Sequence, residues 1–326
     1  ENNPILIDKF IDHAMEIDVD AISDGRQVHV AGIMQHIEEA GIHSGDSACS
    51  LPPVSIKSFL IKEIESQTIK LALALKVVGF MNVQYAIKND KIYVIEVNPR
   101  ASRTVPFVSK AKNLPLAKIA SRVMAGEKLL KFNLKSKTKD MFAVKEAVFP
   151  FNKFPNSDLL LGPEMKSTGE VMGFDKNFGM AFAKSQIAAS NSLPKSGLAF
   201  ISLKNSHKKE GVHLAKQLVK LNFRLCGTSG TADYIVKHGI KCKKINKVNQ
   251  GSPHIVDVLN AKKIALVINT GGGNSETQLS DAVALRRATL ANKVPYCTNM
   301  STAKVCLEGI KSLKLEDINV TSLQDI

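Results

Sequence analysis

A carboxylate, an amide and two arginines lie close together in residues 96–103, which read Glu-Val-Asn-Pro-Arg-Ala-Ser-Arg. In an extended strand, Glu96 and Asn98 point to the same face because successive side chains alternate. Their oxygens suit a hard divalent cation such as Mg²⁺, and Arg100 and Arg103 suit phosphate or carboxylate oxygens. This set of groups is typical of phosphoryl transfer. A surface ion-pair cluster at a strand end is an equally good interpretation of the spacing alone.

A predicted β-hairpin brings a third oxygen-bearing side chain to this motif. Residues 83–87 and 92–98 alternate between apolar and polar side chains, with a turn between them. A three-residue loop over 89–91 makes one face of the hairpin wholly apolar, whereas a two-residue loop mixes the two faces. We therefore predict the three-residue loop, which sets Gln84 opposite Glu96 on the polar face.

A second polar segment, residues 41–47, reads Gly-Ile-His-Ser-Gly-Asp-Ser. Its backbone amides, hydroxyls and imidazole could contact the phosphates or ribose of a nucleotide, although the residues alone favour an ordinary loop. The sequence contains neither a Walker A pattern nor Gly-x-Gly-x-x-Gly, which disfavours P-loop and dinucleotide-binding enzymes.

The elements that must position these residues fall into two groups. In the first group, strands over 16–22 and 28–33 are expected to form a hairpin around Asp24-Gly25. The other elements expected there are helices over 55–78 (with Gly79 as C-cap), 104–126 and 181–189, and strands over 144–149 and 170–174.

In the second group, strands and helices alternate from residue 198 to 297, which predicts a small doubly wound, flavodoxin-like parallel sheet. The expected fold class is therefore α/β, with an α+β part before this sheet. Residues 191–197, rich in Ser, Pro and Gly, mark the expected boundary between domains 1–190 and 191–326.

Ligands of such sheets bind at the carboxyl ends of the strands. Small polar residues that fall there, with two lysines nearby, could bind an anion at helix N-termini, although N-capping and solvated lysines are the favoured interpretation. These residues are Thr228, Thr231, Asn269, Thr270, Lys208 and Lys247.

Composition narrows the function classes. The 326 residues include 44 Lys and Arg against 30 Asp and Glu, which gives a formal charge of +14. Aromatic content is 6% and Trp is absent, which disfavours nucleic-acid binding. No apolar stretch is long enough for a bilayer, and five scattered cysteines favour reduced thiols in the cytoplasm over a zinc site. Because the chain begins Glu-Asn-Asn-Pro, we expect it to start inside a longer reading frame.

Several segments together resemble one family, the carbamoyl phosphate synthetase large chain. The segments that carry the resemblance are 41–48, 81–84, 96–110, 150–155 and 161–170. The resemblance covers nearly the whole chain and corresponds to the carboxyl-terminal part of that large chain. It implies the carboxyl-terminal lobe of the second ATP-grasp unit, followed by a methylglyoxal-synthase-like regulatory domain.

The resemblance implies ATP-dependent phosphorylation of carbamate to carbamoyl phosphate, a step in glutamine-dependent synthesis for arginine and pyrimidines. It implies Mg²⁺ or Mn²⁺ as cofactor, and a glutaminase small subunit and the rest of the large chain as partners. Arg100 and Arg103 match positions near the transferred phosphoryl group and the carbamate. Gln84, Glu96 and Asn98 match the metal ligands. The positions that match ATP contacts are Lys9, Ile11, Glu16, Gly41, Ile42, His43, Ser44, Gln84 and Glu96.

Two effector sites are also implied by the resemblance. Lys208, Thr228, Thr231, Lys247, Asn269 and Thr270 match a site for a nucleotide monophosphate such as UMP or IMP, and Glu38, Asp46, Glu146, Tyr296 and Thr298 match an ornithine site. Residues 271–273, Gly-Gly-Gly, depart from the family pattern and lose a hydroxyl there. The phosphate loop and the first ATP-grasp unit would precede Glu1, so we expect these residues alone not to turn over ATP. The alternative is an isolated effector-binding module without catalysis.

Overall fold

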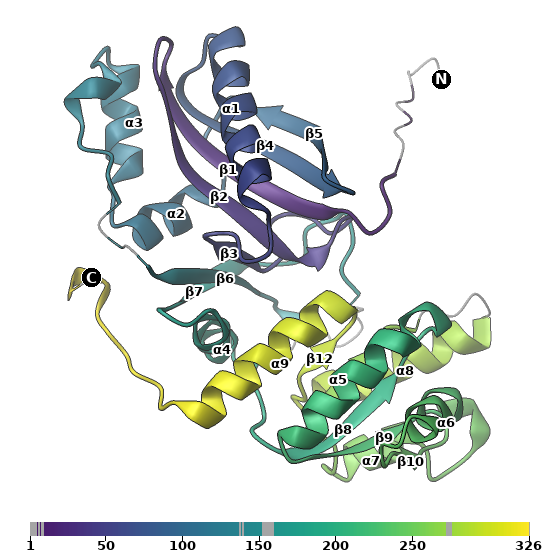
Figure 1. The fold of residues 1–326 in the computed structure, drawn as a ribbon. Helices are drawn as coiled ribbons and strands as arrows, with labels where there is room; N and C mark the ends of the chain where they lie inside the picture. The colour runs from purple at the N-terminus through teal and green to yellow at the C-terminus, as the bar shows by residue number, and fades with distance from the viewer. Residues whose placement is uncertain are drawn as a thin grey trace.

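The structure is a computed structural model that describes residues 5, 7, 10–136, 138, 140–151, 160–271 and 276–325. Two β-sheets with packed helices make up this part of the chain (Figure 1). The antiparallel sheet has the order β5 (Lys91–Asn98), β4 (Val78–Lys88), β1 (Met15–Asp24), β2 (Val28–Glu39), β3 (Cys49–Leu51), β6 (Phe142–Val148) and β7 (Gly169–Asp175). The parallel sheet has the order β10 (Lys243–Lys244), β9 (Phe223–Gly227), β8 (Gly197–Ser202), β11 (Leu266–Asn269) and β12 (Tyr296–Cys297).

The α-helices lie between these strands and after the last of them. They are α1 (Ser58–Ala74), α2 (Val105–Lys112), α3 (Leu116–Met124), α4 (Phe178–Ala188), α5 (Lys208–Lys220), α6 (Ser229–Lys237), α7 (Ile255–Asn260), α8 (Glu276–Ala291) and α9 (Met300–Leu315). An α+β part followed by a doubly wound parallel sheet is the fold class expected from the sequence. Among the described residues, no helix combines the length and the apolar character needed to cross a membrane.

Helix α1 covers one face of β1 and β4 (Figure 1). Val19 and Val83 from these strands lie in one buried apolar cluster with Ile64 of the helix. Inside the same layer, the hydroxyls of Thr68 and Tyr85 form a buried hydrogen bond of 2.8 Å. The packing fixes which face of the sheet is apolar, so the opposite face is left for polar side chains.

Two predicted helices differ from those observed. The first ends at Ala74, and Gly79, its predicted C-cap, is instead part of β4. The helix predicted over 104–126 is divided into α2 and α3, because Asn113 is left-handed (φ 49°) and Pro115 stands at the N-cap of α3.

The hairpin of β4 and β5 has the predicted pairing at the motif but a different turn. Gln84 lies opposite Glu96, as predicted. The loop has two residues, Asn89 and Asp90, with φ of 51° and 60°, typical of a type I′ turn. The prediction of a three-residue loop was wrong because Ile95 is an extra residue in β5, and this β-bulge shifts the register between the turn and the motif.

The parallel sheet has β8 at its centre, with β9 and β10 on one side and β11 and β12 on the other. The order of connections reverses between β8 and β11, so the carboxyl ends of these strands border the crevice in which doubly wound sheets bind ligands. Ser202 and Asn269 are the last residues of the two strands.

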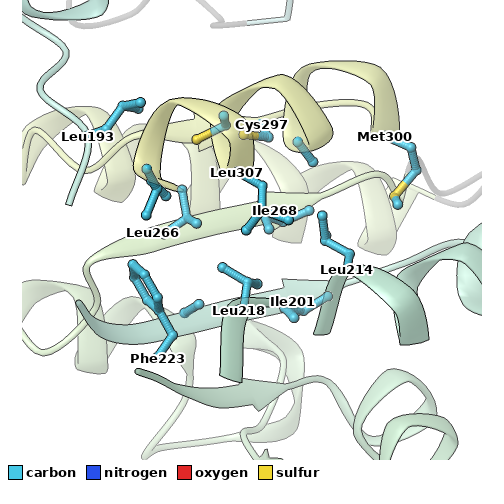
Figure 2. Packing of buried hydrophobic residues seen from close by; sticks show 14 of the residues in the cluster. Leu193, Ile201, Leu214, Leu218, Phe223, Leu266, Ile268, Cys297, Met300 and Leu307 are labelled. Carbon is cyan, nitrogen blue, oxygen red and sulfur yellow. The ribbon is translucent and has the colours of Figure 1, made fainter. Parts of the chain in front are cut away.

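Helix α9, which the sequence analysis did not predict, packs against α4 and the parallel sheet (Figure 1). Figure 2 shows Ile201 and Ile268 of the sheet beneath Leu307 of α9. The same cluster includes Phe182 of α4, which follows the antiparallel sheet in the chain. A continuous apolar core therefore connects the two sheets, and residues 191–197, the expected boundary, run between α4 and β8.

Candidate functional site

The three side chains predicted to bind a divalent cation lie on one face of the antiparallel sheet. Gln84 and Glu96 are opposite each other on β4 and β5. Asn98 follows on β5, and its Nδ2 donates a 2.8 Å hydrogen bond to Glu96 Oε1. Their strand neighbours Val83 and Val97 pack in the layer under α1, so the three polar side chains occupy the opposite face.

The donor set fits a hard cation such as Mg²⁺. One carboxylate and two amides offer oxygen ligands, and the exposed Glu96 carboxylate is accessible to an ion from solvent. Because the set carries a single negative charge, a divalent ion held here keeps positive charge for phosphate oxygens. We find this chemistry consistent with a metal–nucleotide site rather than a closed structural metal site.

The loop over residues 41–47 lies against the same polar face. Gln84 Nε2 donates to Ser44 Oγ over 3.3 Å, and the Gly41 amide donates to Glu16 Oε1 over 3.2 Å. The loop is supported from behind by Lys145, a lysine only 1% exposed, whose Nζ donates to the Ser44 carbonyl over 3.2 Å. The structure thus brings Glu16, Gly41, Ser44 and Gln84 together, as a nucleotide site at this position would require.

Within the described part of the chain, the side chains of the other residues predicted to contact the nucleotide do not hydrogen-bond to the side chains of this group. The imidazole of His43 is turned towards its own loop, with Nδ1 accepting from the Gly45 amide over 3.1 Å. Ile42 is half-buried within this loop, and Ile11 is half-buried in the irregular backbone before β1. Lys9 lies outside the described residues.

The two arginines follow the metal-binding motif but have different surroundings. Arg100 is exposed, and its Nη1 donates to the neighbouring Ala101 carbonyl over 3.0 Å. Arg103 contacts the sulfur of Met165 and lies 3.8 Å from Glu170 Oε2, with 45% of its side chain exposed. Neither guanidinium is enclosed, so both remain accessible to an anion.

A buried charged cluster lies beside the candidate site. His36 Nε2 is 2.9 Å from Asp18 Oδ2, and its Nδ1 is 3.3 Å from Glu16 Oε2. Burial opposes the charged imidazole, but the hydrogen bonds and charges of the two carboxylates raise the pKa of His36 to about 9. Asp18 stands directly opposite Gln84, so β1 alone separates His36 on β2 from the candidate cation ligand Gln84 on β4.

A second buried carboxylate, Asp20, lies two residues further along β1. Asn82 Nδ2 and Ser102 Oγ donate to its Oδ1 over 3.0 and 2.7 Å, and Thr104 Oγ1 donates to its Oδ2 over 2.6 Å. Burial raises the pKa of Asp20 to about 6, against the lowering effect of these hydrogen bonds.

These buried groups were missed by the sequence analysis. The alternation of Glu16, Asp18 and Asp20 fits the strand predicted over 16–22, but the sequence analysis did not predict that Asp18 and Asp20 are buried. Three acidic residues at a spacing of two, of which Asp18 and Asp20 lie opposite polar residues of β4, are a signal that could have found the network. Lys145 carries no such signal, because its burial depends on the loop that folds over it.

A cavity of about 430 Å³ lies at the carboxyl ends of β8 and β11. Five of the six predicted nucleotide-binding residues line it, namely Lys208, Thr228, Thr231, Lys247 and Asn269. Thr270 does not line it, and its amide donates to the Ser202 carbonyl over 3.0 Å. Lys204, Asn205 and Asp281 also line the cavity and were not predicted.

A second cavity, of about 390 Å³, lies between the two sheets. Four of the five residues matched to an ornithine site line it, namely Glu38, Glu146, Tyr296 and Thr298. The fifth, Asp46, is buried elsewhere, and its oxygens accept from the amides of Lys166 and Ser167 over 2.7 and 2.9 Å. Asp46 therefore shapes the adjoining loop in this structure and does not face the cavity.

The two glutamates give this second cavity an acidic wall. Burial, followed by the charge of Glu38, raises the pKa of Glu146 to about 8. Burial also raises the pKa of Glu38. Two carboxylates that resist ionisation together are stabilised by a cationic ligand, because its charge offsets both the desolvation and the repulsion.

Comparison with known proteins gives two family matches. Residues 1–132 match the family described as carbamoyl-phosphate synthase L chain, ATP binding domain, and residues 210–298 match the MGS-like domain. An ATP-binding lobe of the ATP-grasp type followed by an MGS-like domain is thus the class of protein that the fold and the site define.

The chain belongs to the carbamoyl phosphate synthase large chain family. It is 52% identical to the carbamoyl phosphate synthase large chain of Methanobrevibacter smithii over 99% of this chain and 30% of that protein. It is 48% identical to the C-terminal section of the large chain of Aquifex aeolicus, over 99% of this chain and 64% of that protein. The chain therefore spans about 30% of the length of a full large chain and matches its carboxyl-terminal part.

Among solved structures, the biotin carboxylase domain of a thermophilic 2-oxoglutarate carboxylase bound to bicarbonate gives a TM-score of 0.44 at 14% identity. The match covers 56% of this chain and 47% of that chain. The family assignment rests on the sequence relatives.

Proposed function

We propose that this chain forms part of an enzyme that phosphorylates carbamate with ATP to give carbamoyl phosphate. The observation that supports this most directly is the placement of Gln84, Glu96 and Asn98 on one polar face, against the loop over residues 41–47. The pathway in which we place the reaction is glutamine-dependent carbamoyl phosphate synthesis for arginine and pyrimidines, in the cytoplasm. A glutaminase small subunit and the rest of the large chain are the proposed partners.

Each group has a distinct proposed role. Gln84, Glu96 and Asn98 would bind Mg²⁺ or Mn²⁺, which supplies positive charge to the transferring phosphate. Arg103 and Arg100 would bind the anionic oxygens of carbamate and of the phosphoryl group. The 41–47 loop would contact the nucleotide through its amides and the Ser44 hydroxyl.

A charge-removing substitution at Glu96 tests this proposal. In the full-length enzyme with its small subunit, we expect Glu96→Gln to lower carbamoyl phosphate formation by about 100-fold or more, as loss of a direct transition-state contact does. Glu65→Gln, which changes an exposed glutamate on α1, is the matched control and is expected to leave the rate unchanged. Undiminished synthesis by Glu96→Gln at saturating Mg²⁺ would refute the proposed role.

A regulatory function is a second proposal, supported by the two cavities. We infer that residues 191–326 form an effector domain whose cavity at β8 and β11 binds a nucleotide monophosphate such as UMP or IMP, and that residues 1–190 form the catalytic part. Lys208 and Lys247 would bind the phosphate, and threonine hydroxyls would bind its remaining oxygens. The acidic cavity between the sheets would bind the amino groups of ornithine.

Calorimetry on these 326 residues separates the two proposals for the chain by itself. Binding of UMP or IMP without binding of ATP would identify an effector module that lacks half of a catalytic site. Binding of ATP that Glu96→Gln weakens would show that the nucleotide site is already complete here. Loss of UMP and IMP binding in Lys247→Ala, with Lys237→Ala as an α6 control outside the cavity, would locate the effector.

A further inference from the structure

Asp20 is a completely buried carboxylate whose three hydrogen-bond donors lie on two separate segments of the chain. It lies on β1 and is 0% exposed. Asn82 reaches it from β4, and Ser102 and Thr104 reach it from the turn that precedes α2. A charged group in such a position is maintained by its donors, and each donor is in turn fixed by the carboxylate.

The two hydroxyl donors flank Arg103. Thr104 is the N-cap residue of α2, yet its hydroxyl donates to Asp20 and makes no hydrogen bond to the first turn of the helix. Ser102 donates to the other oxygen of the same carboxylate. The backbone on both sides of Arg103 is therefore attached to β1 through one side chain.

The guanidinium of Arg103 has no comparable attachment of its own. It contacts the sulfur of Met165, and its distance to Glu170 Oε2 is 3.8 Å, at a partly exposed position. Such a pair contributes little in water, so it does not fix where the guanidinium lies. The position of the arginine is determined mainly by the turn that carries it.

We propose that Asp20 is a positioning residue for Arg103, holding the 102–104 turn at the end of the metal-binding strands so that the guanidinium meets the anionic substrate. The inference rests on the proposed function. Asn82, the third donor, pairs with Asn98 and stands two residues from Gln84 on β4. One carboxylate therefore ties the cation-binding strands to the arginine-bearing turn.

Isosteric substitutions test this role in the full-length enzyme. Asp20→Asn replaces one of the two acceptor oxygens by an amide donor, so the three donors cannot all be satisfied, and Thr104→Val removes the hydroxyl while keeping the shape. We expect each to lower kcat for carbamoyl phosphate formation by about 10- to 100-fold, because an ångström-scale displacement of a catalytic group has that effect. The KM for ATP should stay within about twofold, since ATP contacts lie elsewhere in the proposed site. Thr104→Ser, which restores the hydroxyl, should recover most of the rate.

A cycle with Arg103 separates positioning from a merely structural role. In an Arg103→Ala background, Asp20→Asn should cause no further loss of kcat, because the group that it positions is absent. Ser121→Ala, which removes a hydroxyl on α3, is the matched control, and melting temperatures identify variants that fail to fold. A loss that is equally large in both backgrounds would overturn the inference, as would a full rate in folded Asp20→Asn and Thr104→Val.

The Glu96→Gln variant distinguishes failure of the Asp20 positioning role from failure of the proposed function. If Glu96→Gln abolishes the reaction while Asp20→Asn leaves it intact, only the positioning role of Asp20 is refuted. If Glu96→Gln retains the full rate, the proposed metal site itself is refuted.

Discussion

Replacing Glu146 by Gln is expected to stabilise the ligand-free protein at neutral and alkaline pH. Glu146 faces the cavity between the sheets together with Glu38, and burial and repulsion raise its pKa to about 8. Gln186 Nε2 donates to Glu146 Oε2 over 2.6 Å, and a glutamine at position 146 still accepts that bond. The substitution therefore removes the charge and little else.

The magnitude follows from the linkage between proton binding and folding. A rise in the pKa of Glu146 from the ordinary 4.5 to about 8 corresponds to about 5 kcal/mol of lost folding stability once the carboxyl is ionised in both the folded and the unfolded state. Because the pKa of Glu146 is higher in the folded state than in the unfolded state, the protonated carboxyl leaves the fold at full stability below pH 4.5, and this stability is lost as the pH rises through 8. Glu38 shares the repulsion, so we expect Glu146→Gln to recover about 2–3 kcal/mol at pH 8.

Urea unfolding at a series of pH values between 5 and 9 measures this difference. The wild-type free energy of unfolding should fall over that range relative to Glu146→Gln, and Glu65→Gln, on the exposed side of α1, should follow the wild type. Calorimetry should show weaker binding of ornithine to Glu146→Gln, since half of the acidic wall is lost. Parallel stability curves for wild type and Glu146→Gln would refute the burial argument.

Two further predictions concern stability. A Cβ at Gly173 would lie 1.9 Å from the Ala181 carbonyl oxygen of α4, so Gly173→Ala should cost about 3 kcal/mol or more and lower the melting temperature, whereas Gly169→Ala, with open space around it, should not. The carboxylates that raise the pKa of His36 stabilise the fold fully below pH 6.5, and this stabilisation is lost as the pH rises through about 9. In urea unfolding over that pH range, the free energy of unfolding of the wild type should therefore fall by about 3 kcal/mol relative to that of His36→Asn.

The polar face of the first sheet could be predicted because side chains alternate between the two faces of a strand, so each pairing leaves only one choice of face for each residue. Alternation in β4 and β5 requires Gln84 and Glu96 to share a face whenever they are paired, and burial of Val83 selects which face. The turn and the bulge were not predictable in the same way. A two-residue turn and an extra residue at Ile95 together give the same pairing at the motif as a three-residue loop, so burial cannot distinguish them.

Features that depend on distant segments escaped the sequence analysis. Helix α9 begins at Met300, directly after β12, and its role became clear only from its packing against α4. Asp46 was matched to a ligand site, but the chain folds amides 166 and 167 onto its carboxylate. Asp20 was predicted only as part of the strand over 16–22, and the turn at residues 102–104 supplies two of the donors to its buried carboxylate.

The candidate catalytic face and the acidic cavity are built on shared strands, which would give the proposed regulation a physical basis. His36, beside the proposed nucleotide site, and Glu38, in the cavity wall, are two residues apart on β2. On β6, Lys145 supports the Ser44 loop while the adjacent Glu146 lines the cavity. A cation that neutralises the two glutamates would change the electrostatic environment of His36 and Lys145, because buried charges that are near one another on a strand interact strongly. Any resulting coupling free energy is reciprocal, so a ligand of the cavity that tightens nucleotide binding must itself bind more tightly, by the same factor, when nucleotide is present.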